Sequence, residues 1–338
     1  MNLPQIREAA REPMKKYCKL CPVCDGRACA GQVPGMGGAL SGSSFQANHK
    51  ALADTRLNLR VIHEAAAPST ALSLFGKTLQ TPILAAPMTG AGYNCGDGMT
   101  EAEFVTALVQ GAEAAGSLGW IGDAADMALF EGGLAGARAS KEGVVAIIKP
   151  RNDLGEITAR FQRAQEAGAI ALGIDLDGAG LVTMALQGQP VGPKSLDQLA
   201  AIRSRTSLPF VVKGIMTPDE ALLCLAAGAD CIVVSNHGGR VLDGCPGVAE
   251  VLPWIADALG GQVPILADGC VRSGVDALKL LGLGAQGVLV GRPLCWGAFG
   301  AGAEGVAATL QTYTQQLYQA MIMTGCASLG EISRNIIF

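Results

Sequence analysis

Short apolar runs recur along the chain from about residue 80 onward, and several of them follow a helical stretch that ends in a small residue and a glycine. Residues 115–117 (Ala-Gly-Ser) precede the run Leu118–Ile121, and residues 227–229 (Ala-Gly-Ala) precede Cys231–Val234. The glycine suits the left-handed conformation that ends many helices, and its small neighbours allow the helix to lie close to a sheet. Because the runs are continuously apolar, they predict strands that are buried on both faces.

Eight runs of this kind follow one another at intervals of about 20 to 40 residues, which leaves room for one strand and one helix in each unit. Eight such units in about 250 residues are typical of a TIM (β/α)8 barrel. A doubly wound open sheet is the alternative, but no glycine-rich dinucleotide fingerprint follows the first run. We therefore predict an α/β fold, a TIM (β/α)8 barrel, with strands at Pro82–Ala86, Leu118–Ile121, Val144–Lys149, Ile170–Asp175, Phe210–Gly214, Ile232–Asn236, Ile265–Asp268 and Val288–Gly291.

The first 80 residues have a different character. We predict a Cys- and Gly-rich N-terminal extension that also caps the bottom of the barrel (residues 1–80), followed by the barrel itself (residues 81–338). After the eighth strand, Gly305–Gly325 predicts a closing helix. Within the extension we expect a charged helix, then a loop, then two strands that plug the barrel: Leu3–Lys19, Cys18–Gly42, and Leu52–Ile62 with Leu72–Phe75.

Composition narrows the class of protein. Of the 338 residues, 49% are hydrophobic and 16% are charged, and the mean hydropathy of +0.33 excludes disorder for most of the chain. The net charge of −4 comes without a basic stripe, so we predict no nucleic-acid partner. The longest run without charge, residues 305–330, contains four glutamines, so we predict no membrane span.

The N-terminus lacks the pattern of an export signal. Its first 19 residues contain no apolar core and carry basic side chains at Arg7, Arg11, Lys15 and Lys16. We therefore expect a cytoplasmic protein whose 11 cysteines are reduced thiols or metal ligands rather than a disulfide framework.

Polar side chains gather at the ends of the predicted strands. In a TIM barrel the C-terminal ends of the strands and the loops after them build the active site. Charged groups concentrated there are costly unless they are paired or bind a ligand, so ion pairs that merely close the barrel are the structural alternative. The strand-end residues are Met88, Thr89, Asp123, Lys149, Asp175, Asp177, Lys213, residues 235–240, Asp268, Arg272, Gly291 and Arg292.

Only one of the three histidines lies at a strand end. His237 is followed by Gly238 and Gly239, which allow a ligand to approach the backbone closely. His49 and His63 lie in the N-terminal region, where we expect surface histidines. His237 is therefore the candidate proton acceptor near neutral pH.

A second group of residues indicates a phosphate site. Gly269 with Arg272, and Gly291 with Arg292, follow the seventh and eighth strands, where barrels of this type usually bind phosphate. A guanidinium binds two phosphate oxygens at once, which an ammonium cannot do. Lys213 on the fifth strand would supply a fixed positive charge at the centre.

These motifs together resemble the FMN-dependent 2-hydroxy-acid oxidase/dehydrogenase family, which includes glycolate oxidase, lactate oxidase and mandelate dehydrogenase. The resemblance runs from about Pro82 to the C-terminus. It rests on residues 212–214 (Val-Lys-Gly), 234–240 (Val-Ser-Asn-His-Gly-Gly-Arg), 268–274 (Asp-Gly-Cys-Val-Arg-Ser-Gly) and 291–293 (Gly-Arg-Pro).

The resemblance implies a bound FMN and a role for each motif. His237 would take a proton from the substrate while a hydride equivalent passes to N5 of the flavin, and Arg240 would bind the substrate carboxylate. Lys213 would stabilise the reduced flavin near N1. The flavin would also be held by Met88, Thr89 and Ser235, with Asp268 on the ribityl chain and Gly269, Arg272, Gly291 and Arg292 on the phosphate.

The substrate side departs from the family pattern. No basic residue lies between Asp175 and Lys194, where the family has a second carboxylate-binding arginine. Lys149 stands where the family has a tyrosine, and Ile147 stands in place of a glutamine that contacts the flavin. The N-terminal substrate tyrosine is missing too, and we expect Tyr93 to replace it. Our predicted substrate-binding residues are Arg240, Lys149 and Tyr93.

Four cysteines near the N-terminus form a motif. Cys18, Cys21, Cys24 and Cys29 are spaced like ferredoxin ligands, although the last gap is one residue longer and no proline follows. We predict no metal and reduced thiols in a mobile loop. An iron–sulfur site, a zinc site and a redox-responsive disulfide are the alternatives.

We therefore expect an FMN-dependent oxidoreductase that oxidises a small 2-hydroxy acid or a related compound. One alternative is an FMN barrel with other chemistry, such as an isoprenoid-diphosphate isomerase, which the missing arginine and Lys149 allow. Another is a flavin-binding redox sensor that uses the four cysteines. The intact string at residues 235–240 favours the oxidoreductase. The expected partners are a small-molecule substrate and further copies of the chain, since resembling proteins are often tetramers.

Overall fold

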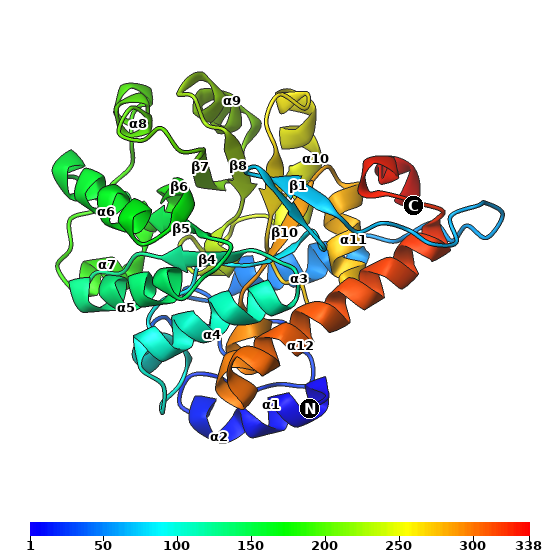
Figure 1. The fold of residues 1–338 in the computed structure, drawn as a ribbon, viewed down its shortest axis with the longest axis horizontal. Helices are drawn as coiled ribbons and strands as arrows, with labels where there is room; N and C mark the ends of the chain where they lie inside the picture. Colours follow the sequence, from blue (N-terminus) through cyan, green and yellow to red (C-terminus); the bar gives the residue numbers. More distant parts are fainter.

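The computed structural model describes all 338 residues and contains a single barrel of eight parallel strands surrounded by helices (Figure 1). Each strand forms hydrogen bonds to the next along the sheet in the order β3-β10-β9-β8-β7-β6-β5-β4. The predicted TIM barrel and all eight predicted strand positions are confirmed. The strands are β3 (Ile83–Ala85), β4 (Gly119–Gly122), β5 (Val144–Ile148), β6 (Ala169–Asp175), β7 (Phe210–Ile215), β8 (Cys231–Val234), β9 (Ile265–Ala267) and β10 (Gly287–Val290).

The sheet closes between its first and last strands. A parallel bridge pairs Met88 with Ile121, and the amide of Ala85 donates to the carbonyl of Leu118 at 3.4 Å. On the other side of β3, Val288 of β10 pairs in parallel with Ile83. Closure leaves no free strand edge, so every strand end at the C-terminal side faces the same central space.

Side chains that point into the barrel form their own buried cluster. Trp120, Val145, Val211 and Leu266 belong to it, and each is completely buried. A two-stranded antiparallel hairpin, β1 (Leu72–Leu74) and β2 (Lys77–Leu79), contributes three leucines to the same cluster. The predicted strand at Leu72–Phe75 is therefore confirmed, and it plugs the barrel as expected.

The helices pack around the outside of the sheet. Glycines end two of them in the left-handed conformation, as the sequence predicts: Gly228 has φ +89° after α9, and Gly284 has φ +119° after α11. The helices between the strands are α4 (Glu101–Ala114), α5 (Met127–Arg138), α6 (Leu154–Glu166), α7 (Val182–Leu186), α8 (Leu196–Arg203), α9 (Pro218–Ala226), α10 (Val248–Leu259) and α11 (Gly274–Gly282).

The closing helix α12 (Arg292–Thr324) is longer than the predicted Gly305–Gly325. It contains a break at Ala301 and Gly302, whose dihedral angles are not helical. The chain turns there because Gly302 adopts φ +59°, a conformation that disfavours other residues. No helix of the structure, α12 included, is both long enough and apolar enough to cross a lipid bilayer.

The N-terminal segment differs from the prediction in two places. The expected helix Leu3–Lys19 is shorter and divided into α1 (Leu3–Ala9) and α2 (Arg11–Met14). The expected strand Leu52–Ile62 is wrong, because Leu52 lies in helix α3 (Ser43–Asp54) and only Leu57 makes an isolated bridge. The predicted loop at Cys18–Gly42 contains no helix or strand, as expected.

Helix α3 packs at the C-terminal end of the barrel rather than at the bottom. Phe45, Asn48 and Leu52 form its buried face, and this amphipathic pattern favours a helix over the predicted strand. The side-chain Nδ2 of Asn48 donates to Oδ1 of Asn236 at 2.7 Å, and Asn236 lies just after β8. The first 80 residues thus cover both ends of the barrel.

Candidate active site

One cavity lies at the C-terminal ends of the strands, and nearly all of the predicted site residues line it. Ser235 is the exception: it is completely buried beneath the cavity. Its hydroxyl donates to Oδ2 of Asp268 at 2.7 Å and accepts from the backbone amide of His237 at 3.0 Å. The predicted residues on the cavity wall are Met88, Thr89, Tyr93, Lys149, Lys213, His237, Arg240, Asp268, Gly269, Arg272, Gly291 and Arg292.

Two arginines make one end of this cavity cationic. Arg292 donates to three backbone carbonyls at 2.7, 3.0 and 3.2 Å, and neither it nor Arg272 forms an ion pair with a carboxylate. Burial and the neighbouring Arg272 lower the pKa of Arg292. The buried Nε of Arg272 has no hydrogen-bond partner. Cationic groups without a counter-charge indicate a site for an anion.

The backbone at the same end presents unused donors. Gly269 has φ +93°, and a Cβ there would lie 2.9 Å from Oδ1 of Asn48. Cys270 also adopts a positive φ, +65°. The amides of Gly269, Cys270 and Gly291 form no hydrogen bond within the chain. Successive backbone amides of this kind form a concave surface that binds anions.

Asp268 lines the same cavity as this anion-binding end. Its Oδ1 atom is buried and has no hydrogen-bond partner. Burial raises the pKa of Asp268, although the nearby Lys213 acts in the opposite direction. An unpartnered buried oxygen is an acceptor that is available to the hydroxyl groups of a ligand.

Lys213 projects from β7 as a buried cation. Its Nζ lies 2.9 Å from Oδ1 of Asp175 and 4.0 Å from Oδ2 of Asp177. Burial alone would lower the pKa of Lys213, but these two carboxylates raise it above its usual value. Lys213 therefore stays positively charged at neutral pH.

His237 lies beside this lysine, in the loop after β8. Its Nδ1 atom lies 2.7 Å from Oδ1 of Asp177 and 3.5 Å from Oδ2 of Asp175. When Nδ1–H donates to Asp177, the lone pair of the neutral ring lies on Nε2, which has no partner in the chain. The strand-end position of Asp177, two residues after Asp175, is predicted from the sequence, but its pairing with His237 is not.

Lys149 lies in a different environment from the one expected. Its ammonium group pairs with Asp175, so this carboxylate is shared between Lys149 and Lys213. Burial opposes ionisation of Asp175, but the two ammonium groups hold its pKa well below the usual value. Donor atoms of Asp175, Asp177 and His237 come within 4.8 Å of one another, but the two lysines already neutralise the carboxylates.

Arg240 is the third arginine of the cavity. It donates to the backbone carbonyl of Gly35 and, at 3.1 Å, to Oδ1 of Asn94. Burial and Arg292 lower the pKa of Arg240 to about 10. Tyr93 lines the same part of the cavity, and burial followed by the charge of Glu101 raises the pKa of its hydroxyl. Arg240 has no carboxylate partner in the chain, so it is available to an anionic ligand.

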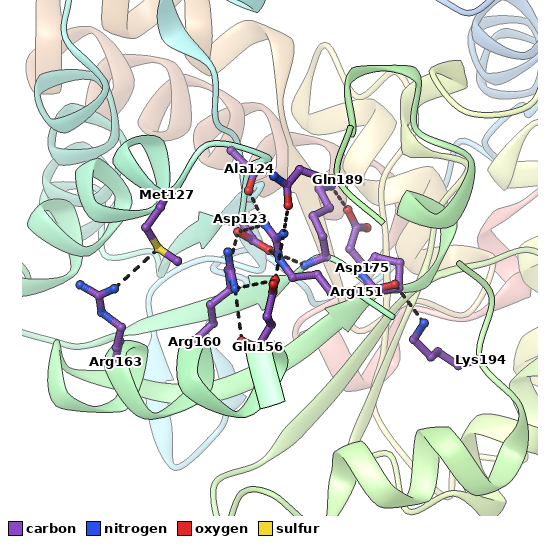
Figure 2. Close-up of polar contacts among 12 residues, drawn as sticks. Asp123, Ala124, Met127, Arg151, Glu156, Arg160, Arg163, Asp175, Gln189 and Lys194 are labelled. Carbon is purple, nitrogen blue, oxygen red and sulfur yellow. Dashed lines mark hydrogen bonds and ion pairs between the residues drawn. The ribbon is translucent and has the colours of Figure 1, made fainter. Parts of the chain in front are cut away.

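A buried ionic network supports the wall that carries Lys149 (Figure 2). Asp123 accepts from Nε of Arg151 and from Nε of Arg160, both at 3.2 Å, and from the amide of Lys149 at 3.0 Å. Arg151 also donates to Oε1 of Gln189 at 2.9 Å, and this bond connects the segment after β6 to the network. The strand-end position of Asp123 is predicted from the sequence, whereas its two arginine partners are not.

The segment after β6 closes the cavity with apolar side chains. Leu181 and Met184 line the cavity together with Thr183, at the edge where the family resemblance implied a second arginine. Leu181 and Met184 are buried against Ala125. The structure thus agrees with the sequence in placing no cation there.

Comparisons with known proteins identify the family. The chain matches the family described as FMN-dependent dehydrogenase over residues 35–186 and 183–338. The chain belongs to this family. FMN is accordingly its cofactor, and a mandelate oxidase mutant that carries an FMN adduct has the same fold, with a TM-score of 0.76 and 28% identity over 96% of both chains.

Individual relatives of this family differ in how much of the chain they match. The 2-hydroxyacid oxidase of Dictyostelium discoideum is 46% identical over 142 residues, or 42% of this chain and 37% of the relative. The chain therefore matches only about two fifths of that relative's length. The L-lactate oxidase of Nostoc sp. is 29% identical over 87% of this chain and 89% of its own length. A crystal structure of mandelate oxidase gives a TM-score of 0.77 at 26% identity, covering 97% and 96% of the two chains.

The residues of the cavity fit FMN. The unpaired Arg272 and Arg292 and the free amides around Gly269 suit a phosphate, and the orphaned oxygen of Asp268 suits a ribityl hydroxyl. Lys213 supplies a fixed positive charge at the centre of the same cavity. No backbone shift is needed to bring these groups to one cavity wall.

Proposed function

We propose that this member of the FMN-dependent dehydrogenase family oxidises a small 2-hydroxy acid or a related compound. One observation carries the proposal. The cavity holds an imidazole whose free Nε2 faces no protein group, and an arginine without a carboxylate partner, His237 and Arg240. A proton acceptor beside a carboxylate-binding cation is what the oxidation of a 2-hydroxy acid requires.

The cofactor end of the cavity would bind FMN through its phosphate. Arg272 and Arg292 would neutralise the phosphate charge, and the amides of Gly269 and Gly291 would donate to its oxygens. Asp268 would accept from the ribityl chain. FMN, when bound, supplies the acceptor for the hydride equivalent that leaves the substrate.

The proton would be taken by Nε2 of His237. The carboxylate of Asp177 holds the ring in the tautomer that leaves Nε2 unprotonated, and it stabilises the imidazolium that forms. Lys213 keeps a positive charge buried in the same cavity, where it favours negative charge that develops during the reaction. Ser235 fixes the backbone of His237 from below.

Substrate binding would depend on one arginine rather than two. Arg240 would bind the carboxylate, and Tyr93 would lie close to it. Lys149 lines the cavity wall but is paired with Asp175. Its main role would be to keep this carboxylate in place, and it would contact the substrate only as part of the wall. Leu181 and Met184 would face the substituent on the hydroxyl carbon, which favours an apolar substituent.

We further propose a cytoplasmic protein that assembles into a homo-oligomer, with a tetramer as the expected form. All 11 cysteines are free in the structure, which agrees with a reducing compartment.

Leu59, Val61 and Ile62 expose 71%, 68% and 98% of their surface on one short segment, which is a surface suited to a second copy. Light scattering of the purified protein measures the assembly, and a monomer at all concentrations would exclude it.

An anaerobic titration tests the proposed activity. Purified protein loaded with FMN is mixed without oxygen with a panel of 2-hydroxy acids, and the flavin absorbance is followed. We expect bleaching by at least one of them and formation of the matching 2-oxo acid. A protein that takes up no FMN, or a bound flavin that no 2-hydroxy acid bleaches, would refute the proposal. Isomerisation of a diphosphate without net bleaching would support the isomerase alternative.

A further inference from the structure

Four cysteines outside the proposed reaction line one small cavity. Cys18, Cys21, Cys24 and Cys29 surround a space that is also lined by Arg292, at the start of α12. All four thiols are free and partly buried. The cavity lies next to the cationic end of the active site, because Arg292 lines both.

The loop that carries these thiols packs closely against its neighbours. Gly26 has φ +88°, and a Cβ there would lie 2.6 Å from Cγ of Phe45. A Cβ on Gly37 would lie 1.9 Å from the carbonyl oxygen of Cys29. The backbone therefore fits closely around the cysteines, as expected where a chain is built to place ligands.

The spacing of the sulfur atoms does not suit a single ion. A tetrahedral zinc site with Zn–S bonds of about 2.3 Å holds its sulfurs about 3.8 Å apart. No three of these thiols come within 4.8 Å of one another. A cluster of several iron and sulfide ions holds its cysteine sulfurs farther apart and fills the space between them.

A cation of the active site already contacts one of the sulfurs. Nη2 of Arg272 lies 3.4 Å from Sγ of Cys24, in hydrogen-bonding geometry. Donors to cysteine sulfur and neighbouring positive charge stabilise the anionic thiolate ligands of iron–sulfur clusters. Arg272 thus connects the cysteine cavity with the flavin phosphate site.

We propose that Cys18, Cys21, Cys24 and Cys29 bind a four-iron, four-sulfur cluster beside the phosphate end of the FMN site. This assignment replaces the reduced thiols that the sequence favoured. It rests on the four thiols that line one cavity and on the contact of Arg272 with Cys24, and it does not depend on which substrate the enzyme oxidises.

Metal and sulfide analysis of anaerobically prepared protein tests the assignment. After reconstitution with ferric iron, sulfide and a thiol reductant, we expect about four iron and four acid-labile sulfide ions per chain, together with an electron paramagnetic resonance signal after reduction with dithionite. One zinc ion per chain without iron, or no bound metal with all four thiols open to alkylation in the native protein, would overturn the proposal.

Cysteine variants test binding of the cluster separately from binding of FMN. We expect Cys21→Ser and Cys24→Ser to lose iron and sulfide but to keep FMN, whereas Cys245→Ser, which lies outside the cavity, keeps all three. FMN content shows that the variants are folded. Iron content unchanged in both cavity variants would contradict the assignment. Because FMN reduction by 2-hydroxy acids is measured separately, failure of the cluster is distinguishable from failure of the proposed activity.

Discussion

Nδ1 of His237 lies 2.7 Å from Oδ1 of Asp177, and this contact joins the loops after β8 and β6. The two residues are 60 positions apart in the chain, and only the closed barrel brings them together. The carboxylate fixes the ring so that Nε2 carries the lone pair that the proposed reaction needs.

Replacing Asp177 should slow catalysis without emptying the flavin site. Asp177→Asn keeps the size of the side chain but removes the charge that stabilises the imidazolium. We expect kcat to fall about 100-fold or more, within the usual range for general base catalysis, while FMN content stays unchanged. Steady-state kinetics measures the loss. Asp197→Asn, on the exposed surface of α8, is the matched control. An Asp177→Asn variant with full kcat would exclude a role for the pair.

Arg240 should determine the affinity for the substrate carboxylate. Arg240→Met removes a charged hydrogen bond, which costs about 1.5–3 kcal/mol. We expect KM for a 2-hydroxy acid to rise roughly 10- to 100-fold, while KM for the corresponding uncharged 2-hydroxy amide stays nearly the same. Kinetics with the two substrates in parallel makes the comparison. An equal rise for acid and amide would mean that Arg240 acts through the fold rather than on the carboxylate.

Arg292 should determine the affinity for FMN. Arg292→Met removes one of the two unpaired cations that face the phosphate, so we expect the protein to lose flavin during gel filtration. The increase in Tm that FMN gives the wild-type protein should shrink, since stabilisation by a ligand falls with the logarithm of its affinity. Arg138→Met, at the exposed end of α5, tests for a general effect of losing an arginine. Equal FMN retention by both variants would argue against the phosphate site.

Asp175 should stabilise the fold because it is the shared carboxylate of two buried lysines. Asp175→Asn leaves the buried Lys149 and Lys213 without their shared carboxylate, and the loss of one partner from a buried ion pair costs about 3–5 kcal/mol. We expect the double variant Asp175→Asn/Lys149→Met to recover part of this loss. Chemical denaturation near pH 7 measures both differences. If the double variant is less stable than the single one, the loss in Asp175→Asn does not come from two buried ammonium groups left without a counter-charge.

The same ion cluster fixes a pH window. The folded pKa of Asp175 lies below its usual value, so its contribution is fully present above the ordinary Asp pKa and declines as the pH falls through the folded pKa. The difference in unfolding free energy between wild type and Asp175→Asn should therefore stay constant from pH 7 to about pH 4 and shrink below that. A difference that already shrinks between pH 7 and pH 5 would show that the carboxylate is protonated more easily than the structure indicates.

The barrel could be predicted from the sequence because its signals are local. Each strand is a continuous apolar run, and glycines such as Gly228 and Gly284 mark the helix end before it. Helix α3 could not be predicted in the same way. The apolar residues at its end look like the start of a strand until Phe45 and Asn48 pack against the top of the barrel.

The positions of the site residues could be predicted from the sequence, but the contacts between their side chains could not. The strand-end positions identified His237 and Lys213, because the fold places all such positions around one cavity. Asp123 binds Arg151 and Arg160, which lie 28 and 37 residues away, and no local pattern indicates that contact. Asp177 had a signal, but the sequence did not show which of two neighbouring aspartates faces the histidine.

In the proposed reaction, His237 removes the proton while the bound flavin is reduced. The most direct measurement mixes FMN-loaded wild type and His237→Gln, without oxygen, with a 2-hydroxy acid that bleaches the wild-type flavin, and follows the absorbance in a stopped-flow instrument. We predict equal FMN content in the two proteins and a bleaching rate that is at least about 100-fold lower in the variant. Bleaching of His237→Gln at the wild-type rate would contradict the account.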